Sequence, residues 1–243
     1  MSLQFEGFTE EMFSFLYYRR VDDEDGMQGI LRRMDAFGTK LRHKSLQALD
    51  SSFYRAHHVA CYPEEQRSCL LSLGSANRGH LLSIAHPEVS LSEAGLYVHV
   101  HAGSKWAIRL LRENLRCRTD EFLRILTKLP EPFELRLSRW NRRRRKRRPV
   151  VPPLIRVSHQ EVRQPACLQF QRLLRLLDTI PCPIFSVSKH LDRRHVVALG
   201  GNGLISEVSD MMRAFHPLVL FLNENVADSG GAMPSEEPEQ TGV

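Results

Sequence analysis

The segment EAGLYVHVHAG at positions 93–103 alternates strictly between apolar and polar side chains. Leucine and valine fill one face of an extended chain, and the other face carries Tyr97, His99 and His101. Since successive side chains of a β-strand point to opposite faces of the sheet, this period of two predicts a strand with one buried face and one solvated face. That pattern is typical of antiparallel sheets, because strands of parallel sheets are usually apolar on both faces. The chain is therefore expected to contain an antiparallel sheet with a polar face.

The segments around this strand show the period of a helix in some places and the period of a strand in others. We predict helices after Thr9 and at residues 29–49, 105–126 (with a break near Arg118–Thr119), 165–177 and 204–222. We predict strands at residues 69–73, 81–85, 95–101, 133–138, 184–188 and 195–199, and a short extended piece at 154–158. DDEDG at 22–26 predicts a turn or an exposed loop, and GGNG at 200–203 predicts a connection between strand and helix. Strands clustered between helices indicate an α+β fold, with helices covering an antiparallel sheet.

A single domain accounts for residues 1–225. A chain of this length can bury enough apolar surface to fold without a disulfide or a metal. The five cysteines have no disulfide spacing, so we expect reduced thiols. Residues 226–243 are small, polar and acidic, which is typical of a disordered tail. The predicted core includes Phe37, Leu41, Val98, Val100, Ile108, Leu111, Leu135, Leu174, Val197 and Leu218.

The positive charge of the chain is concentrated in SRWNRRRRKRRPVVPP, residues 138–153. The formal net charge is +6, and the seven adjacent cations from Arg142 to Arg148 contribute +7, which leaves 6 − 7 = −1 for the rest of the chain. The prolines that follow exclude a regular helix or a central strand at this point. Residues 139–153 are therefore predicted to be a basic loop inserted into the domain.

Adjacent cations attract polyanions, because each phosphate that they neutralise releases condensed counterions. We predict that the loop binds nucleic acid or another polyanion without reading its sequence, since contacts to a phosphate backbone carry no base code. A localisation signal and a solvated loop without a ligand fit the same residues. The predicted binding residues are Arg139, Trp140, Arg142, Arg143, Arg144, Arg145, Lys146, Arg147 and Arg148, with Trp140 as a stacking surface.

His99 and His101 form a second candidate site, because an i, i+2 pair on a strand places two imidazoles on one face, about 7 Å apart. Metal sites in sheets use this spacing. Further ligands from the other histidines would match no known template, so we predict no metal site and no cofactor. The alternative to polyanion binding is an enzyme, metal-assisted or not, that acts on an anionic substrate. Its catalytic candidates are His99, His101 and Arg78.

The GSANRG stretch, residues 74–79, predicts a hairpin turn. Backbone N–H groups in a glycine-rich turn, with an arginine beside them, suit an anion. We therefore name Asn77, Arg78 and Gly79 as an anion-binding candidate. A plain hairpin is the alternative, because the stretch lacks the strand-to-helix context of known phosphate loops.

The opening FEGFTEEMF, the pair Arg33–Met34 in a long helix and the turn LGSANRG together resemble the bacterial YktB-like family. The similarity extends over roughly residues 5–137. It implies an α+β fold of helices on an antiparallel sheet, and no reaction, because none is assigned to that family. The paired arginines ahead of the turn and the HPHF strand of the family have no clear equivalents here, and His80 and His86 match only loosely.

Several classes of protein lack support in the sequence. There is no G-x-S-x-G motif and no cysteine in a recognisable nucleophile signature. The segment MSLQFEGFTEEMF has neither the basic nor the apolar region of a signal peptide, and PLVLFL is far shorter than the ~20 residues of a membrane span. We therefore expect a cytoplasmic protein without a membrane segment, and we leave its substrate and oligomeric state open.

Overall fold

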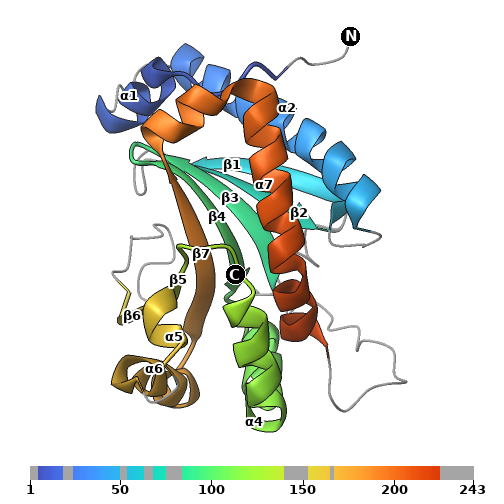
Figure 1. The fold of residues 1–243 in the computed structure, drawn as a ribbon. Helices are drawn as coiled ribbons and strands as arrows, with labels where there is room; N and C mark the ends of the chain where they lie inside the picture. Colours follow the sequence, from blue (N-terminus) through green and yellow to red (C-terminus); the bar gives the residue numbers. More distant parts are fainter. Residues whose placement is uncertain are drawn as a thin grey trace, which may run out of the picture.

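Seven antiparallel strands form one sheet in the computed structural model, which describes residues 5–18, 24–49, 54–62, 68–74, 84–139, 153–164 and 167–224. The strands are β1 (Ala56–Tyr62), β2 (Ser68–Gly74), β3 (His86–Ser92), β4 (Gly95–Ala102), β5 (Glu134–Arg139), β6 (Ile155–Ser158) and β7 (Pro183–Asp192). The helices are α1 (Glu10–Tyr18), α2 (Glu24–Ala48), α4 (Lys105–Thr127), α5 (His159–Val162), α6 (Leu168–Thr179) and α7 (Arg193–Asn223). The strand order is β1-β2-β3-β4-β7-β5-β6 (Figure 1). The predicted α+β fold with an antiparallel sheet is confirmed.

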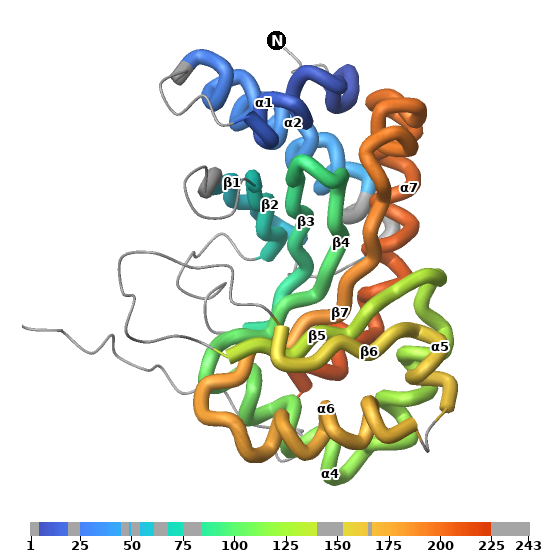
Figure 2. Tube along the Cα trace, turned by 90° about the vertical axis from the view of Figure 1, so that its left-hand side faces the viewer, coloured from blue at the N-terminus to red at the C-terminus, as the bar shows by residue number. Residues whose placement is uncertain are grey.

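The two faces of the sheet differ in the way that the alternation in β4 predicted. Leu96, Val98 and Val100 are fully buried, whereas Tyr97 and His99 are only half-buried. The buried side chains face α2, α4, α6 and α7, which contact the strands and share one core with them. In Figure 2 the described helices lie above, below and to the right of β2, β3 and β4, and none lies over their other face. We call this polar side of the sheet the open face.

The predicted core is confirmed. Eight of the ten named residues are buried, and Leu174 and Val197 are partly buried against the same cluster. The predicted break in the long helix is also confirmed, because the backbone of α4 leaves helical geometry at Arg118. The helix after Thr9 is α1, and the predicted helices at 29–49 and 165–177 correspond to α2 and α6.

The predicted strand at 195–199 is wrong, because these residues form the first turns of α7. Asp192 caps the helix by accepting a hydrogen bond from the backbone N–H of His195 at 3.0 Å. The helix is interrupted at Gly200, whose φ of +60° lies in a region that favours glycine. The GGNG stretch therefore joins two helical segments instead of a strand and a helix.

The strand predicted at 81–85 is also displaced, since Ile84 and Ala85 are not in a strand and β3 begins at His86. Pro87 is the second residue of this strand, although proline has no N–H to donate to a ladder. Pro87 pairs with Val100 of β4, but the pairing of β2 with β3 ends at Glu88. Proline is tolerated at this point because the ladder with β2 does not extend to it.

Two further expectations were wrong, and one strand was missed. β1 was not predicted at all, and α2 includes residues 24–26, which were expected to be a turn or an exposed loop. Cys69 is disulfide-bonded, whereas Cys117, Cys167 and Cys182 are free thiols as expected. The predicted GSANRG turn beyond Gly74, the cationic run and the acidic tail lie outside the described residues.

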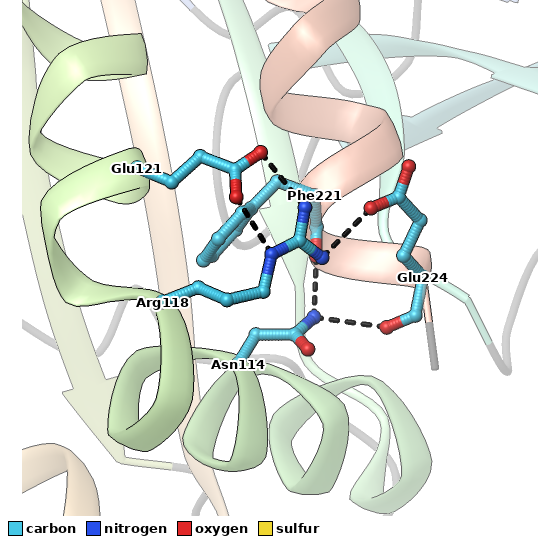
Figure 3. Close-up of polar contacts among 5 residues, drawn as sticks. All are labelled: Asn114, Arg118, Glu121, Phe221 and Glu224. Carbon is cyan, nitrogen blue, oxygen red and sulfur yellow. Dashed lines mark hydrogen bonds and ion pairs between the residues drawn. The ribbon is translucent and has the colours of Figure 1, made fainter. Parts of the chain in front are cut away.

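The C-terminal end of α7 is fastened to α4 at the break in that helix (Figure 3). Asn114 is fully buried and donates hydrogen bonds to the carbonyl oxygens of Phe221 at 2.5 Å and Glu224 at 2.9 Å. The Arg118 guanidinium donates to Glu121 and Glu224 and lies 5.2 Å from the centre of the Phe221 ring. The two bonds from Asn114 satisfy carbonyl groups at a helix end, which otherwise lack partners within the helix. We call this group the helix clamp.

Candidate functional site

The open face carries two rows of polar side chains that run across the strands. The first, which we call the basic row, takes one residue from each of β3, β4, β7, β5 and β6 in direct register: His86, His101, Ser186, Arg136 and Arg156. The second, which we call the acidic row, begins one strand earlier: Ser72, Glu88, His99, Ser188, Glu134 and Ser158. With strands about 4.8 Å apart, the basic row extends over about 19 Å. The sheet thus sorts its charges into neighbouring bands.

The basic row lies toward one particular end of the strands. β5 ends at Arg139, three residues beyond Arg136, and Arg139 is exposed. β6 pairs antiparallel with β5, and the N–H of Leu154 donates to the carbonyl of Leu137 at 2.8 Å. The strands on both sides of the cationic run are therefore joined to each other, at the end of the sheet where the basic row lies.

Glu88 is the centre of the polar contacts on the open face. Its carboxylate accepts a hydrogen bond from the Ser72 hydroxyl at 2.8 Å and contacts Nε2 of His99 at 2.9 Å. Nε2 of His86 lies 3.5 Å from Oε1 of Glu88, the same oxygen that accepts from Ser72. The Glu88 side chain is only 14% exposed. A carboxylate with so little water is stabilised only if protein groups replace the water, and these three do so.

The geometry around His86 indicates that this imidazole is protonated on both nitrogens. Nδ1 lies 3.2 Å from the carbonyl oxygen of Ile84, and Nε2 faces the Glu88 carboxylate. Both partners are acceptors, and a neutral imidazole has only one N–H to donate. The imidazolium form satisfies both contacts and places a positive charge beside Glu88.

The pKa values of this pair move apart for the same reason. Burial by itself would lower the pKa of His86, but the contact with Glu88, its negative charge and the Ile84 carbonyl outweigh burial and raise it. Burial would raise the pKa of Glu88, but the contacts with His86 and His99 and the charges of His101 and His99 hold it well below its usual range. Each shift favours the charged form of its group, so the contact favours an imidazolium–carboxylate pair.

The two histidines predicted as a site do lie on the same face, but they have different neighbours. His99 contacts Glu88, whereas the His101 ring lies 5.9 Å from the ring of His86, centre to centre. A Cβ added at Gly103 would come within 2.7 Å of Nε2 of His101, so the His101 ring lies close against this glycine. The predicted third member, Arg78, lies outside the described residues with Asn77 and Gly79, so their convergence stays a prediction.

A second group of planar side chains lies on the open face beside the acidic row. Tyr97 and His190 stand directly opposite each other on β4 and β7, with ring centres 4.3 Å apart and planes inclined by 24°. The Arg136 guanidinium lies 5.6 Å from the centre of the Tyr97 ring and donates two hydrogen bonds to Glu134. Glu134 also lies 3.5 Å from the Nε of Arg156. One carboxylate thus holds two arginines of the basic row.

Sequence reasoning missed Glu88, although the signal was present. His86, Glu88 and Ser90 alternate with Pro87, Val89 and Leu91, which is the same period of two that identified β4. The sequence around Arg156 and His190 does not indicate that these residues belong to the site. Only the register of β6 and β7 brings them there.

Among the described residues, no group of three or more His, Cys, Asp or Glu side chains is placed to hold a metal ion. Within the same residues, no helix has the length and apolar character that crossing a membrane requires. Of the predicted nucleic-acid-binding residues, only Arg139 is described.

The comparisons with known proteins assign no family. No family model matches the chain, and a search of curated proteins found no match. The resemblance to the YktB-like family therefore stays a prediction.

Proposed function

We propose that the protein binds nucleic acid or another polyanion without sequence specificity, through the cationic run and the strand pair that holds it. The proposal rests first on charge. The seven cations from Arg142 to Arg148 exceed the net charge of +6 of the whole chain, so the remainder supplies no general attraction for anions. The flanking Arg139 and Trp140 add one more cation and one stacking surface.

The observation that carries the proposal is the register of β5 and β6. Arg136 and Arg156 are directly opposite each other on these strands, and Arg139 is exposed at the end of β5. The two strands that enter and leave the basic loop therefore present arginines of their own on the open face. A loop that only joined two strands would not require cations on the strands as well.

A polyanion is favoured over a small anion as the ligand. The acidic row lies beside the basic row and neutralises part of its charge, so a small anion would be bound only weakly. Glu134 is paired with both Arg136 and Arg156, so these arginines offer only part of their charge to a ligand. A ligand with many phosphates gains from each of the remaining cations at once, and it releases a counterion with each contact. Binding is therefore expected to weaken steeply as salt is added.

The test compares two variants with the same net charge. In the first, Arg142, Arg143, Arg144 and Arg145 are changed to Gln. The control changes four exposed helical arginines to Gln, namely Arg32, Arg124, Arg172 and Arg175. Affinity for a single-stranded oligonucleotide is measured by fluorescence anisotropy from about 50 to 200 mM salt. Loss of four phosphate contacts should reduce the slope of log K against log salt by about 3 for the loop variant alone. Equal slopes for the two variants, or no binding by the wild type at low salt, would disprove the proposal.

Acid–base catalysis on an anionic substrate is a second proposal, favoured by the contact between His99 and Glu88. A carboxylate on one imidazole nitrogen fixes the orientation of the ring and leaves the other nitrogen for a substrate, an arrangement that general bases use. The assay is hydrolysis of two anionic esters, p-nitrophenyl phosphate and bis-p-nitrophenyl phosphate. If the proposal holds, wild type accelerates at least one reaction, and His99→Gln loses about 10²-fold or more in rate. His195→Gln is the control, because His195 contacts Glu207 on the exposed surface of α7. No acceleration, or equal loss in both variants, would remove this proposal.

A further inference from the structure

The stacked pair Tyr97 and His190 differs from the other polar contacts on the open face. Tyr97 is half-buried, but His190 is exposed, so one side of the pair is available to solvent. Nε2 of His190 lies 3.3 Å from the carbonyl oxygen of Ala94, which holds the imidazole in place. The ring is therefore fixed in orientation before any ligand arrives, and less freedom is lost when a ligand binds.

A cation and a basic row accompany this pair. The Arg136 guanidinium lies over the Tyr97 ring, so the planar groups of β5, β4 and β7 form one continuous set. Arg136 belongs to the basic row, which leads to Arg156 on the neighbouring strand. Planar rings beside cations at strand spacing suit a chain of alternating bases and phosphates, because bases stack on rings while phosphates pair with arginines.

We infer that His190 and Tyr97 form a stacking site for an unpaired nucleobase, so that the polyanion bound by this protein is a single-stranded nucleic acid. The inference rests on the proposed polyanion-binding function and adds the class of ligand. A base within a duplex is already stacked on its neighbours, whereas an unpaired base has a free π-face. Every base has such a face, so the site requires no particular sequence.

A purely structural role for the pair makes a different prediction. Cross-strand aromatic pairs stabilise a sheet, and loss of such a pair lowers stability without any effect that depends on the ligand. The two roles are separated by a ligand that keeps the phosphates and lacks the bases. An oligonucleotide of abasic sites has the same backbone charge as an ordinary single strand of the same length.

The experiment measures the affinity of the full chain for a 12-nucleotide single strand and for its abasic counterpart at one low salt concentration. Wild type should bind the base-containing strand about tenfold more tightly, since one base stacked on an aromatic side chain contributes about this much. His190→Ala should lose this preference and bind both strands alike, whereas His190→Phe, which keeps a ring, should retain it. His195→Ala, which removes another exposed histidine, should behave like wild type.

The outcomes separate the inference from the function on which it rests. If wild type binds neither strand, polyanion binding itself fails, and the stacking site with it. If wild type binds both strands equally, or if His190→Ala keeps the preference for bases, polyanion binding stands and the stacking site is wrong. Thermal unfolding of His190→Ala within about 2 °C of wild type ensures that a lost preference is not lost folding.

Discussion

Arg118 and Arg136 have the same kinds of neighbours in two different regions of the molecule. Each guanidinium lies over an aromatic ring, at 5.2 Å from Phe221 and 5.6 Å from Tyr97, and each bonds to glutamate. Their side chains are also similarly exposed, at 27% and 31%. They differ in what they connect. Arg118 joins two helices through the helix clamp, whereas Arg136 lies on the open face.

This comparison shows that contacts around a single arginine do not reveal its role. In the helix clamp, the carboxylates come from α4 and from the residue after α7, and the buried Asn114 lies beside them (Figure 3). On the open face, Glu134 belongs to the same strand as Arg136. The first arginine therefore connects distant parts of the chain, while the second is held locally. We expect the clamp to affect stability and the open face to affect binding.

The largest effect is expected from Asn114→Ala in the helix clamp. The change removes two hydrogen bonds to the end of α7, a buried one to the carbonyl of Phe221 and a partly buried one to the carbonyl of Glu224. The free energy of unfolding should fall by about 2–3 kcal/mol, because the buried Phe221 carbonyl is left without its donor and the Glu224 carbonyl loses a second bond. Urea denaturation measures the difference. Asn202→Ala, at an exposed position of α7, is the control and should change stability by less than about 0.5 kcal/mol. A loss below 0.5 kcal/mol for Asn114→Ala would contradict a structural role for the clamp.

Glu88→Gln tests whether a buried residue on the open face contributes to the free energy of unfolding, as the residues of the helix clamp do. Glu88 lies on the open face but is largely buried among His86, His99 and Ser72. The variant should lose about 2 kcal/mol near pH 6, since it leaves a buried imidazolium beside a neutral amide. The control is Glu207→Gln, which breaks a glutamate–histidine contact of the same length, 2.9 Å, at the surface.

The pH dependence of that difference follows from the two pKa shifts. The raised pKa of His86 means that its contribution is fully present below about pH 6.5 and is lost as the pH rises through the folded-state pKa. The lowered pKa of Glu88 means that its contribution is present above about pH 4.5 and is lost in stronger acid. The gap between wild type and Glu88→Gln should therefore be widest at about pH 5–6. A gap that grows from pH 6 to pH 9 would contradict this account.

Arg118→Gln should have a smaller effect, about 1 kcal/mol, because the arginine and both glutamates are partly exposed to water. The loss arises mainly from the two parallel hydrogen bonds to Glu121, which give this ion pair a fixed geometry. Added salt should reduce the difference between variant and wild type. Urea denaturation of both proteins at low and at high salt measures this difference in the free energy of unfolding. A difference of zero at low salt would mean that Asn114 alone holds the end of α7.

The sequence allowed the open face to be predicted, but not the contacts on it. The alternation of Tyr97, His99 and His101 with apolar residues is a local property of one strand, so the prediction of a half-buried strand was correct. Glu88 joins His99 only because β3 pairs with β4 in one register, which no local pattern contains. The same holds for Tyr97 and His190, which are far apart in the chain and opposite in the sheet.

The helix clamp shows the same limit in a different way. The break near Arg118 was predicted, and it is present. Its partner Glu224 lies 106 residues away, and nothing in either segment connects the two. The wrong strand at 195–199 came from a short apolar run, which fits a strand and a buried helical turn equally well. The hydrogen bond from the backbone N–H of His195 to the Asp192 side chain caps a helix at this point, and this bond is seen only in the structure.

The smallest effect on stability is expected from Arg136→Gln, and it completes the comparison with Arg118. Glu134 keeps a second partner in Arg156, at 3.5 Å, so the change leaves no buried charge alone. The free energy of unfolding should therefore change by less than about 0.5 kcal/mol. Affinity for a single-stranded oligonucleotide should nevertheless fall by about 1 kcal/mol, or about fivefold at low salt, because a cation beside the stacked rings is lost. Arg118→Gln is the matched control and should show the reverse, with lower stability and unchanged affinity. If both variants lose stability alike and bind alike, the two arginines have the same role and the proposed division between clamp and open face is wrong.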